Sequence, residues 1–306
     1  MEEEQVVKKN SINRVITGTI IAIIVLSCLF FGGIALLLML TLFIIIGSKE
    51  YVKILKNKGF YPSLKVILLS DLILALLIYF HRFDLIAPAL TLCSVVAFLW
   101  VLFKGRQPYI ANAATTILGF IYSGWFPLHL LSIRGINSDY PLGLLKLNIQ
   151  NDGLGFVIFL FVTVLLTDTG CYYFGKKFGK HKLAPTVSPK KTIEGSIGGA
   201  FCAVVGALVV GHFINLGIYN TIILGLLCTI FAQIGDLCES LIKRDAGVKD
   251  SGDLLPGHGG FLDRTDSYVF TIPVMYYYLN YFVVSHQLGV DFINFIKDIL
   301  RAHGIL

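Results

Sequence analysis

Acidic and basic residues concentrate in two polar segments of the chain, residues 168–194 and 236–267. The first holds two of the 19 acidic residues and the second holds seven, and together they hold 10 of the 25 lysines and arginines. Carboxylates are the hard oxygen ligands that Mg²⁺ takes, and ammonium and guanidinium groups bind phosphates. Mixed charge of this density is also typical of a solvated loop, so the spacing has to decide between these interpretations.

In the second segment the acidic residues recur at helical spacing. Asp236 and Glu239 are three residues apart and Lys243 follows four later, so one helix face carries all three. Asp263 and Asp266, again three apart, open the next apolar run, where acids also complement the helix dipole. A pair of acids beside Asp236 on a neighbouring helix predicts a Mg²⁺ site.

A glycine-rich loop lies between these acids, at residues 250–260. Glycines allow the backbone to approach a ligand and expose successive N–H groups, which suits phosphate oxygens. His258 stands between two glycines, where it either donates to a phosphate or simply occupies the turn. We interpret it as a phosphate donor, because a turn of this composition needs no histidine.

The first segment offers one further acid and a cluster of lysines. Asp168 follows the apolar run 154–167, where a carboxylate is costly unless it is paired or bound to metal. Lys190 and Lys191 stand just before a glycine-rich apolar helix that Thr192 is expected to cap. Two lysines there oppose the helix dipole, which predicts a phosphate shared between them and the helix N-terminus. The alternative is a positively charged anchor at the cytoplasmic face.

The composition restricts the elements that position these residues. Of 306 residues 56% are hydrophobic and 14% are charged, and the mean hydropathy is +0.77. These values exclude a soluble, disordered or collagen-like chain and predict an all-α polytopic membrane protein. The net charge of +6 then marks cytoplasmic loops and not nucleic-acid binding.

The apolar runs predict nine transmembrane helices. The run 15–47 is long enough for two, joined at Gly32-Gly33, and seven single spans follow at 66–81, 85–103, 109–130, 154–167, 195–214, 219–235 and 268–286. With the N-terminus inside, 20 lysines and arginines face the cytoplasm and five face outward. This asymmetry predicts a multi-pass protein of the inner cell membrane, with the N-terminus and both polar segments in the cytoplasm.

The spans divide into an N-terminal region of about five (1–153) and a catalytic region (154–290), followed by an amphipathic tail (291–306) expected on the membrane surface. Asp71 lies within the third span, where snorkelling or pairing with Lys65 is expected. The glycine-rich span 195–214 is suited to close packing and makes a homodimer plausible.

Residues 240–266 resemble the signature of the phosphatidate cytidylyltransferases (CDP-diacylglycerol synthases), S-x-φ-K-R-x4-K-D-x-G-x2-φ-P-x-H-G-G-φ-x-D-R-x-D with φ apolar. Every fixed position is met: Ser240, Lys243, Arg244, Lys249, Asp250, Gly252, Pro256, His258, Gly259, Gly260, Asp263, Arg264 and Asp266. The stretches 168–170 and 188–195 resemble the family's second conserved block. The resemblance is specific from about residue 165 to 270, whereas the N-terminal half matches only as a hydrophobic region.

The resemblance implies that CTP and phosphatidic acid react at the bilayer to give CDP-diacylglycerol and pyrophosphate. It implies Mg²⁺ as cofactor, with a monovalent cation as a candidate second metal. The expected catalytic residues are Asp236, Lys243, Arg244, Lys249, Asp250, His258, Asp263, Arg264 and Asp266. The expected phosphate-binding residues are Ser188, Lys190, Lys191, Thr192, Ser240, Gly259 and Gly260, and the expected metal ligands are Asp236, Asp263, Asp266 and Asp168.

Two other functions stay open on the sequence. The same fold is compatible with a CTP-dependent enzyme that acts on another membrane lipid, either a prenol kinase or a CDP-archaeol-type synthase. An ion or solute transporter also carries acids in broken apolar segments. The concentration of charge in two segments, with no visible inverted repeat, disfavours the transporter.

Overall fold

The computed structural model describes residues 22–136, 152–252 and 259–284. The predicted tail 291–306, most of the loop 131–153 and His258 lie outside these ranges. The described chain is helical apart from one small hairpin. After the helix Ala22–Phe31 come α2 (Gly33–Asn57), α3 (Leu64–Tyr79), η1 (Phe83–Leu85), α4 (Ile86–Lys104), α5 (Tyr109–Phe120), η2 (Ile121–Trp125), α6 (Phe126–Arg134), α7 (Asp152–Phe178), β1 (Lys182–Ala184), β2 (Ser188–Thr192), α8 (Ile193–Phe213), α9 (Ile218–Asp245), α10 (Leu262–Tyr278) and η3 (Leu279–Val284).

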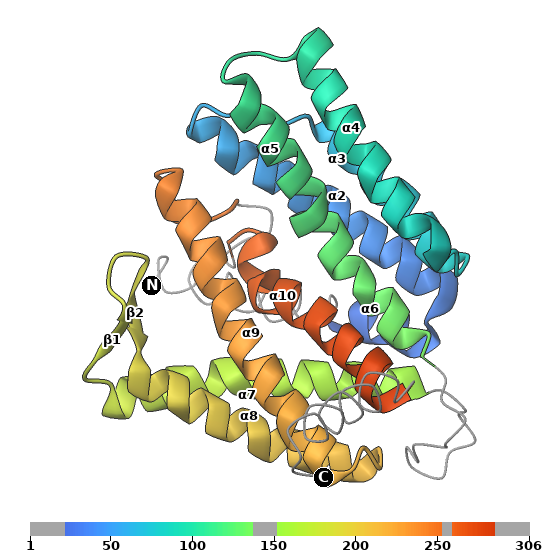
Figure 1. Cartoon of the computed structure of the whole chain (residues 1–306). Helices are drawn as coiled ribbons and strands as arrows, with labels where there is room; N and C mark the ends of the chain where they lie inside the picture. The colour runs from blue at the N-terminus through green and yellow to red at the C-terminus, as the bar shows by residue number, and fades with distance from the viewer. Residues whose placement is uncertain (1–21, 137–151, 253–258, 285–306) are drawn as a thin grey trace, which may run out of the picture.

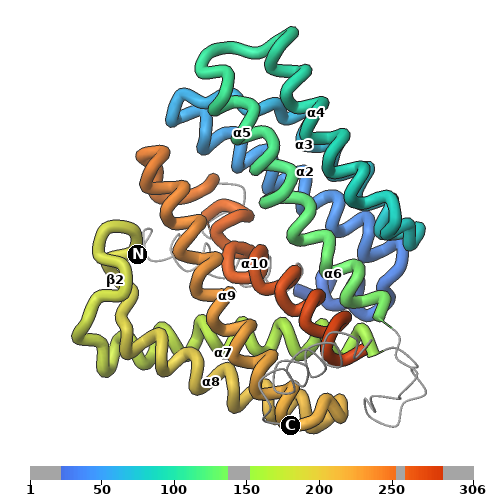
Figure 2. The backbone as a smooth tube through the Cα atoms, viewed as in Figure 1, coloured from blue at the N-terminus to red at the C-terminus, as the bar shows by residue number. Residues whose placement is uncertain are grey.

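The helices form two groups that meet at α10 (Figure 1). α7 and α8 run side by side, and α9 packs on both and continues along α10. The opposite side of α10 packs on α6, which belongs with α2 to α5. The trace in Figure 2 follows the same path and places the hairpin β1–β2 at one end of the α7–α8 pair. The C-terminal polar segments therefore reach the N-terminal helices through α10.

Six described helices are long and apolar enough to cross a membrane: α2, α4 with η1, α5 to α6, α7, α8 and α9. The expectation of an all-α membrane protein is therefore confirmed, with the two-stranded hairpin as an addition that the sequence did not predict. The count of nine spans is not confirmed, because the helix Ala22–Phe31, α3 and α10 are shorter.

Several helices extend beyond their predicted spans. The predicted break at Gly32 is present, where the backbone has φ +64°, but α2 continues past residue 47 to Asn57. α7 ends at Phe178 and α9 at Asp245, so much of both polar segments is helical. The hydrophobic run marks only the apolar part of a helix, whereas the polar turns beyond it are stabilised by contacts with one another.

Glycines let α7 and α8 approach closely. A Cβ at Gly170 would lie 2.8 Å from the Cα of Gly199, which leaves no room for a side chain at either position. A Cβ at Gly198 would lie 2.2 Å from the ring of Phe174 on α7. The glycines expected to support a homodimer are therefore used within the chain.

Gly199→Ala is expected to lower the thermal stability of the purified protein. Its Cβ would lie 2.3 Å from Cys171 Sγ and 2.8 Å from the carbonyl oxygen of Thr167. Overpacking of this kind costs about 1–3 kcal/mol, which outweighs the roughly 1 kcal/mol that alanine gains over glycine in a helix. Thermal unfolding in detergent measures the effect, with Ile197→Ala on the 66% exposed face of α8 as control. A Gly199→Ala protein as stable as the wild type would contradict the packing argument.

The environment of Asp71 differs from the one that the sequence predicted. Its side chain is buried, and neither carboxylate oxygen has a hydrogen-bond partner among the described residues, so the pairing with Lys65 is not present. The carboxylate packs against Gly124 in η2, where a Cβ would lie 1.8 Å from Oδ1.

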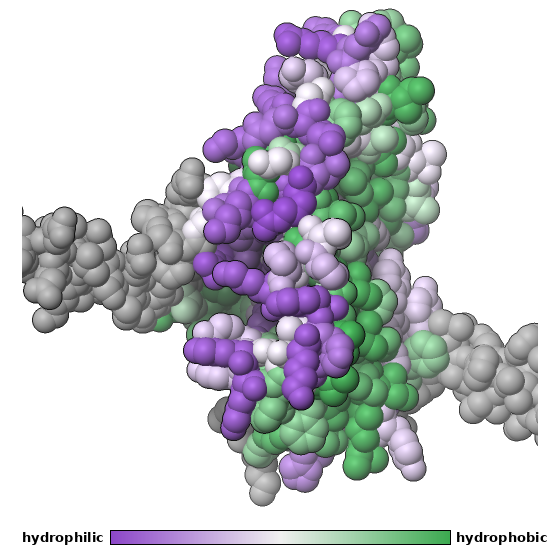
Figure 3. Space-filling view, turned by 90° about the vertical axis from the view of Figure 1, so that its left-hand side faces the viewer, coloured by the Kyte–Doolittle hydropathy of each residue, from purple (hydrophilic) through white to green (hydrophobic). Residues whose placement is uncertain are grey.

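The polar ends of the helices gather on one face of the molecule. Hydrophilic residues run along this face in Figure 3, beside a hydrophobic surface. Lys58 at the end of α2 pairs with Asp245 at the end of α9, at 2.9 Å. Many exposed basic residues belong to these helix ends and to the hairpin: Lys53, Lys56, Lys58, Lys176, Lys177, Lys180, Lys182, Lys190, Arg244 and Lys249. The segments expected on one side of the membrane thus lie on one side of the fold.

Candidate active site

Four carboxylates from three helices converge where α7, α9 and α10 meet. The Ser267 hydroxyl on α10 lies 3.4 Å from a carboxylate oxygen of Asp168 on α7 and 3.3 Å from one of Asp266. Asp236 and Glu239, one turn apart on α9, lie near Asp266. Two segments about a hundred residues apart therefore contribute to one acidic cluster, which we define as Asp168, Asp236, Glu239 and Asp266.

Two lysines border the acidic cluster on opposite sides. Lys191, from β2, forms an ion pair with Asp236. Lys243 on α9 is 3.1 Å from Glu239 and also pairs with Asp263, and its side chain is only 10% exposed. Successive residues of a strand point to opposite sides, so Lys191 points inward while Lys190 is exposed.

The carboxylates here outnumber the cationic groups. The acidic cluster and Asp263 make five carboxylates, against the ammonium groups of Lys191 and Lys243. Burial, and then the charge of Asp236, raise the pKa of Asp266 to about 6. Glu239 Oε1 is buried and has no hydrogen-bond partner among the described residues. Excess negative charge with an unused buried oxygen is what a site for a hard divalent cation requires.

The side-chain positions do not yet form a complete coordination sphere. Within residues 22–136, 152–252 and 259–284, no three His, Cys, Asp or Glu side chains are close enough to hold one ion together. The donor chemistry of the acidic cluster fits Mg²⁺, but Asp236 is engaged by Lys191 in this arrangement.

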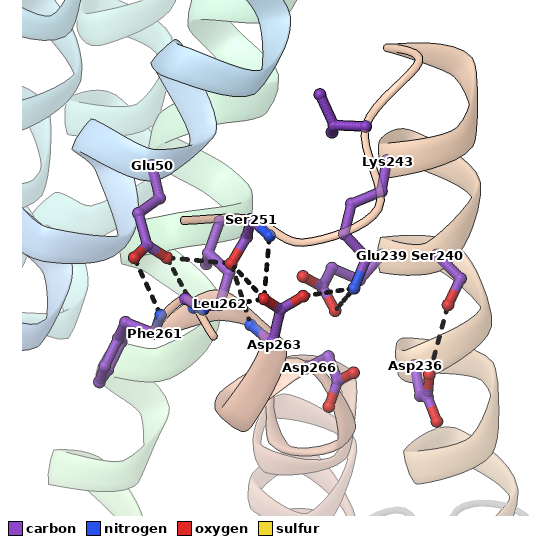
Figure 4. Close-up of polar contacts among 12 residues, drawn as sticks. Glu50, Asp236, Glu239, Ser240, Lys243, Ser251, Phe261, Leu262, Asp263 and Asp266 are labelled. Atoms are coloured by element: carbon purple, nitrogen blue, oxygen red, sulfur yellow. Dashed lines mark hydrogen bonds and ion pairs between the residues drawn. The ribbon is translucent and has the colours of Figure 1, made fainter. Parts of the chain in front are cut away.

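Asp263 faces away from Asp236 and is occupied by protein donors (Figure 4). One carboxylate oxygen contacts Lys243, and the other accepts from the backbone N–H groups of Ser251, at 2.9 Å, and Gly260, at 3.0 Å. Burial by itself raises the pKa of Asp263, but these hydrogen bonds outweigh it and hold the pKa below its ordinary value. The metal role expected of Asp263 stays a prediction, and so does the phosphate role of Gly260, whose N–H is already used.

Side-chain contacts tie the hairpin to α8 and α9. Thr192 caps α8 as expected, because its hydroxyl accepts from the N–H of Gly195 at 3.1 Å. Glu194 accepts from the backbone N–H of Lys180 at 3.0 Å and pairs with His181 at 2.6 Å. The Arg244 side chain donates to the Val187 carbonyl oxygen at 3.4 Å. These contacts fix β2, and with it the direction of Lys191.

The other expected residues are more peripheral. The Ser240 hydroxyl is 3.5 Å from Asp236, and Ser188 pairs with Ala184 at the start of β2. Gly259 has φ +81°, a conformation that favours glycine. Arg244, Lys249, Asp250 and Arg264 are exposed, and their predicted roles toward substrate phosphates stay predictions.

Sequence reasoning missed three residues at the site. Glu50 on α2 accepts from the backbone N–H groups of Phe261 and Leu262, both at 2.9 Å. Ser251 and Ser267 link the carboxylates described above. Ser251 stands inside the signature at a variable position. The available signal for Glu50 was an acid three residues after the long apolar run 15–47, in a part of the chain without motifs.

Comparison with known proteins identifies the family of this chain. The sequence model of the cytidylyltransferase family matches residues 12–282. A phosphatidate cytidylyltransferase of Synechocystis is 37% identical over 290 residues, which cover 87% of this chain and 95% of the relative. Relatives of the same name are 35% identical in Staphylococcus haemolyticus, over 275 residues, and 34% identical in Staphylococcus aureus, over 269; each alignment covers 86% of this chain and 96% of the relative. The chain belongs to the cytidylyltransferase family.

Proposed function

We propose that this protein transfers the cytidylyl group of CTP to phosphatidic acid, giving CDP-diacylglycerol and pyrophosphate. The observation that carries the proposal is the junction of segments 168–194 and 236–266, which places an acidic cluster and Lys191 at the polar ends of membrane helices. A phosphate at this depth is reachable from a lipid whose acyl chains stay in the bilayer. The family model and a relative named phosphatidate cytidylyltransferase both match most of the chain.

The chemistry joins two anions, so it depends on positioning and charge neutralisation. An oxygen of the phosphatidate phosphate forms a bond to the α-phosphorus of CTP, and the bond to the pyrophosphate oxygen breaks. The attacking oxygen is already ionised near neutral pH, so no strong general base is required. Lys191, released from Asp236, binds a substrate phosphate and neutralises part of its charge.

Asp168, Asp236 and Asp266 are the carboxylates that would hold Mg²⁺, with Glu239 beside them. Held there, Mg²⁺ would supply Lewis-acid chemistry that polarises the triphosphate and favours departure of pyrophosphate. Asp263, whose metal role stays a prediction, holds Lys243 and the start of α10. The site faces the cytoplasm, where CTP is found, because the basic helix ends lie on the same face of the fold.

Removing divalent metal is expected to abolish the reaction. Membranes that contain the protein are given labelled CTP and phosphatidic acid, and pyrophosphate and CDP-lipid are followed. EDTA should stop both products and added Mg²⁺ should restore them, because the excess carboxylate charge then regains its counter-ion. Turnover that is unchanged in EDTA would contradict the metal proposal.

The same assay separates the alternatives. A prenol kinase gives CDP and a prenyl phosphate in place of pyrophosphate, so a prenol acceptor with CDP release would replace the proposed function. An archaeal-type lipid as the better acceptor would change only the substrate. Solute uptake into vesicles without CTP, with no CDP-lipid formed, would favour a transporter.

A further inference from the structure

Four consecutive backbone N–H groups lead into α10, at residues 260–263, and side chains satisfy all of them. Gly260 donates to Asp263 at 3.0 Å, and Asp263 donates to the Ser251 hydroxyl at 3.3 Å. The two central groups, of Phe261 and Leu262, donate to the two carboxylate oxygens of Glu50, each at 2.9 Å. A carboxylate from α2, more than 200 residues earlier, therefore serves as the cap of α10.

A continuous face of α2 is shaped for this contact. The face consists of Phe43, Gly47 and Glu50, at helical spacing. The Phe43 ring lies 4.8 Å from the Phe261 ring, and a Cβ at Gly47 would lie 3.3 Å from the Leu262 side chain. Glu50 is 7% exposed, so its carboxylate depends on these backbone donors.

Two signature glycines make room for the same carboxylate. A Cβ at Gly252 would lie 2.7 Å from Glu50 Oε1, and a Cβ at Gly260 would lie 2.9 Å from Oε2 and 1.9 Å from the Ser251 hydroxyl. Gly252 and Gly260 are fixed positions of the signature near the two ends of its loop. Packing against Glu50 thus explains the absence of a side chain at Gly252, whereas at Gly260 the Ser251 hydroxyl and the backbone of Gly252 fill the space together with Glu50.

The contacts continue from Glu50 to the acidic cluster (Figure 4). Ser251 Oγ is 3.2 Å from Glu50 and 3.0 Å from Asp263. Asp263 pairs with Lys243, which pairs with Glu239. Each side chain in this series holds the next, and Asp266 follows Asp263 by three residues on the same helix.

We propose that Glu50 is a positioning residue for the cytidylyl transfer. It fixes both ends of the signature loop and the start of α10, so that Asp266 and Lys243 keep their places at the acidic cluster. The N-terminal helices thereby take part in building the site. This inference rests on the proposed function, although the contacts themselves do not.

Glu50→Gln in the full-length protein tests the proposal. Glutamine keeps the size but sets an NH₂ donor against a backbone N–H, so kcat for CDP-lipid formation is expected to fall about 10- to 100-fold, as is usual when a supporting partner of a metal site is lost. The Mg²⁺ concentration for half-maximal rate should rise, while the KM for phosphatidic acid stays within about twofold. Ser251→Ala, which removes one hydroxyl, should show the same pattern with a smaller loss.

Two control variants alter charges of the same helix outside this network. Lys49→Gln changes the exposed neighbour of Glu50, and Lys58→Gln breaks the exposed ion pair with Asp245. Both should keep kcat and the Mg²⁺ response, because exposed charges contribute little. Hydrogen exchange of the amides of residues 260–263 is read in the same samples and should be faster in Glu50→Gln than in Lys49→Gln.

The outcomes separate this inference from the proposed function. If the wild type forms no CDP-lipid, the proposed function fails, and amide exchange alone decides whether Glu50 holds α10. If the wild type is active and Glu50→Gln matches it in kcat and Mg²⁺ response, the positioning role is overturned. It is also overturned if Glu50→Gln only lowers the amount of folded protein and leaves the folded fraction with normal kinetics.

Discussion

Asp266→Asn is expected to lower kcat by about 100-fold or more without loss of folded protein. Asp266 lies between Asp263 and Asp236 in the site and is the carboxylate of α10 that would hold the metal ion (Figure 4). Stabilisation of a transferring phosphoryl group by a metal ion amounts to several kcal/mol, and about 1.4 kcal/mol corresponds to a factor of ten in rate. Removing one charged ligand should therefore nearly abolish turnover, which release of pyrophosphate measures.

Although Asp266→Asn should lose activity, its folded state should be as stable as that of the wild type or more stable. Because burial and Asp236 raise the pKa of Asp266 to about 6, the folded state binds its proton more tightly than the unfolded state does. The stability that this provides is complete below pH about 4 and is lost as the pH rises through 6. At pH 7.5 in EDTA, Asp266→Asn should thus melt at or above the temperature of the wild type. Mg²⁺ should stabilise the wild type more than the variant.

Asp245→Asn is the matched control for Asp266→Asn, because it neutralises an exposed acid that forms an ion pair with the exposed Lys58. Its activity and melting temperature should both stay close to those of the wild type. Wild-type turnover in Asp266→Asn would remove this residue from the metal site, and an unfolded variant would contradict the electrostatic argument.

Lys243→Met is expected to destabilise the protein by about 3–5 kcal/mol, the usual cost of removing one partner from a buried ion pair. Its ammonium group is 3.1 Å from Glu239 and also contacts Asp263, and both of these carboxylates are largely buried. Without the lysine they face one another uncompensated, next to Asp266. The yield of folded protein and its unfolding in detergent measure the effect.

Lys191→Met provides the contrast. Within the described residues Lys191 forms its ion pair with Asp236, and both side chains are more exposed (26% and 30%) than Lys243 (10%), so stability should fall less than in Lys243→Met. Activity should fall, because we propose that this ammonium group binds a substrate phosphate. If Lys243→Met were as stable as Lys191→Met, the buried network around Asp263 would not hold α10 as described.

Local patterns in the sequence determined the parts of the site that lie within one helix. The spacing of Asp236, Glu239 and Lys243 predicted one shared face, and the 3.1 Å contact between Lys243 and Glu239 confirms this for that pair. Thr192 caps α8 as its position predicted. The apolar runs and the signature likewise established a membrane protein of this family, since hydropathy and motif are properties of the chain alone.

Tertiary structure decided which groups meet across helices. The sequence indicated Asp263 as a partner of Asp236, but the loop around Ser251 and Gly260 surrounds its carboxylate with donors. No pattern in the sequence predicted the contact between Glu50 and the signature, because this contact requires α2 to pack against a helix that begins 212 residues after Glu50. The spacing of residues in the sequence predicts only which side chains are neighbours along one helix or strand. The free-energy cost of burying a charged group depends on the hydrogen-bond donors that tertiary packing places around that group.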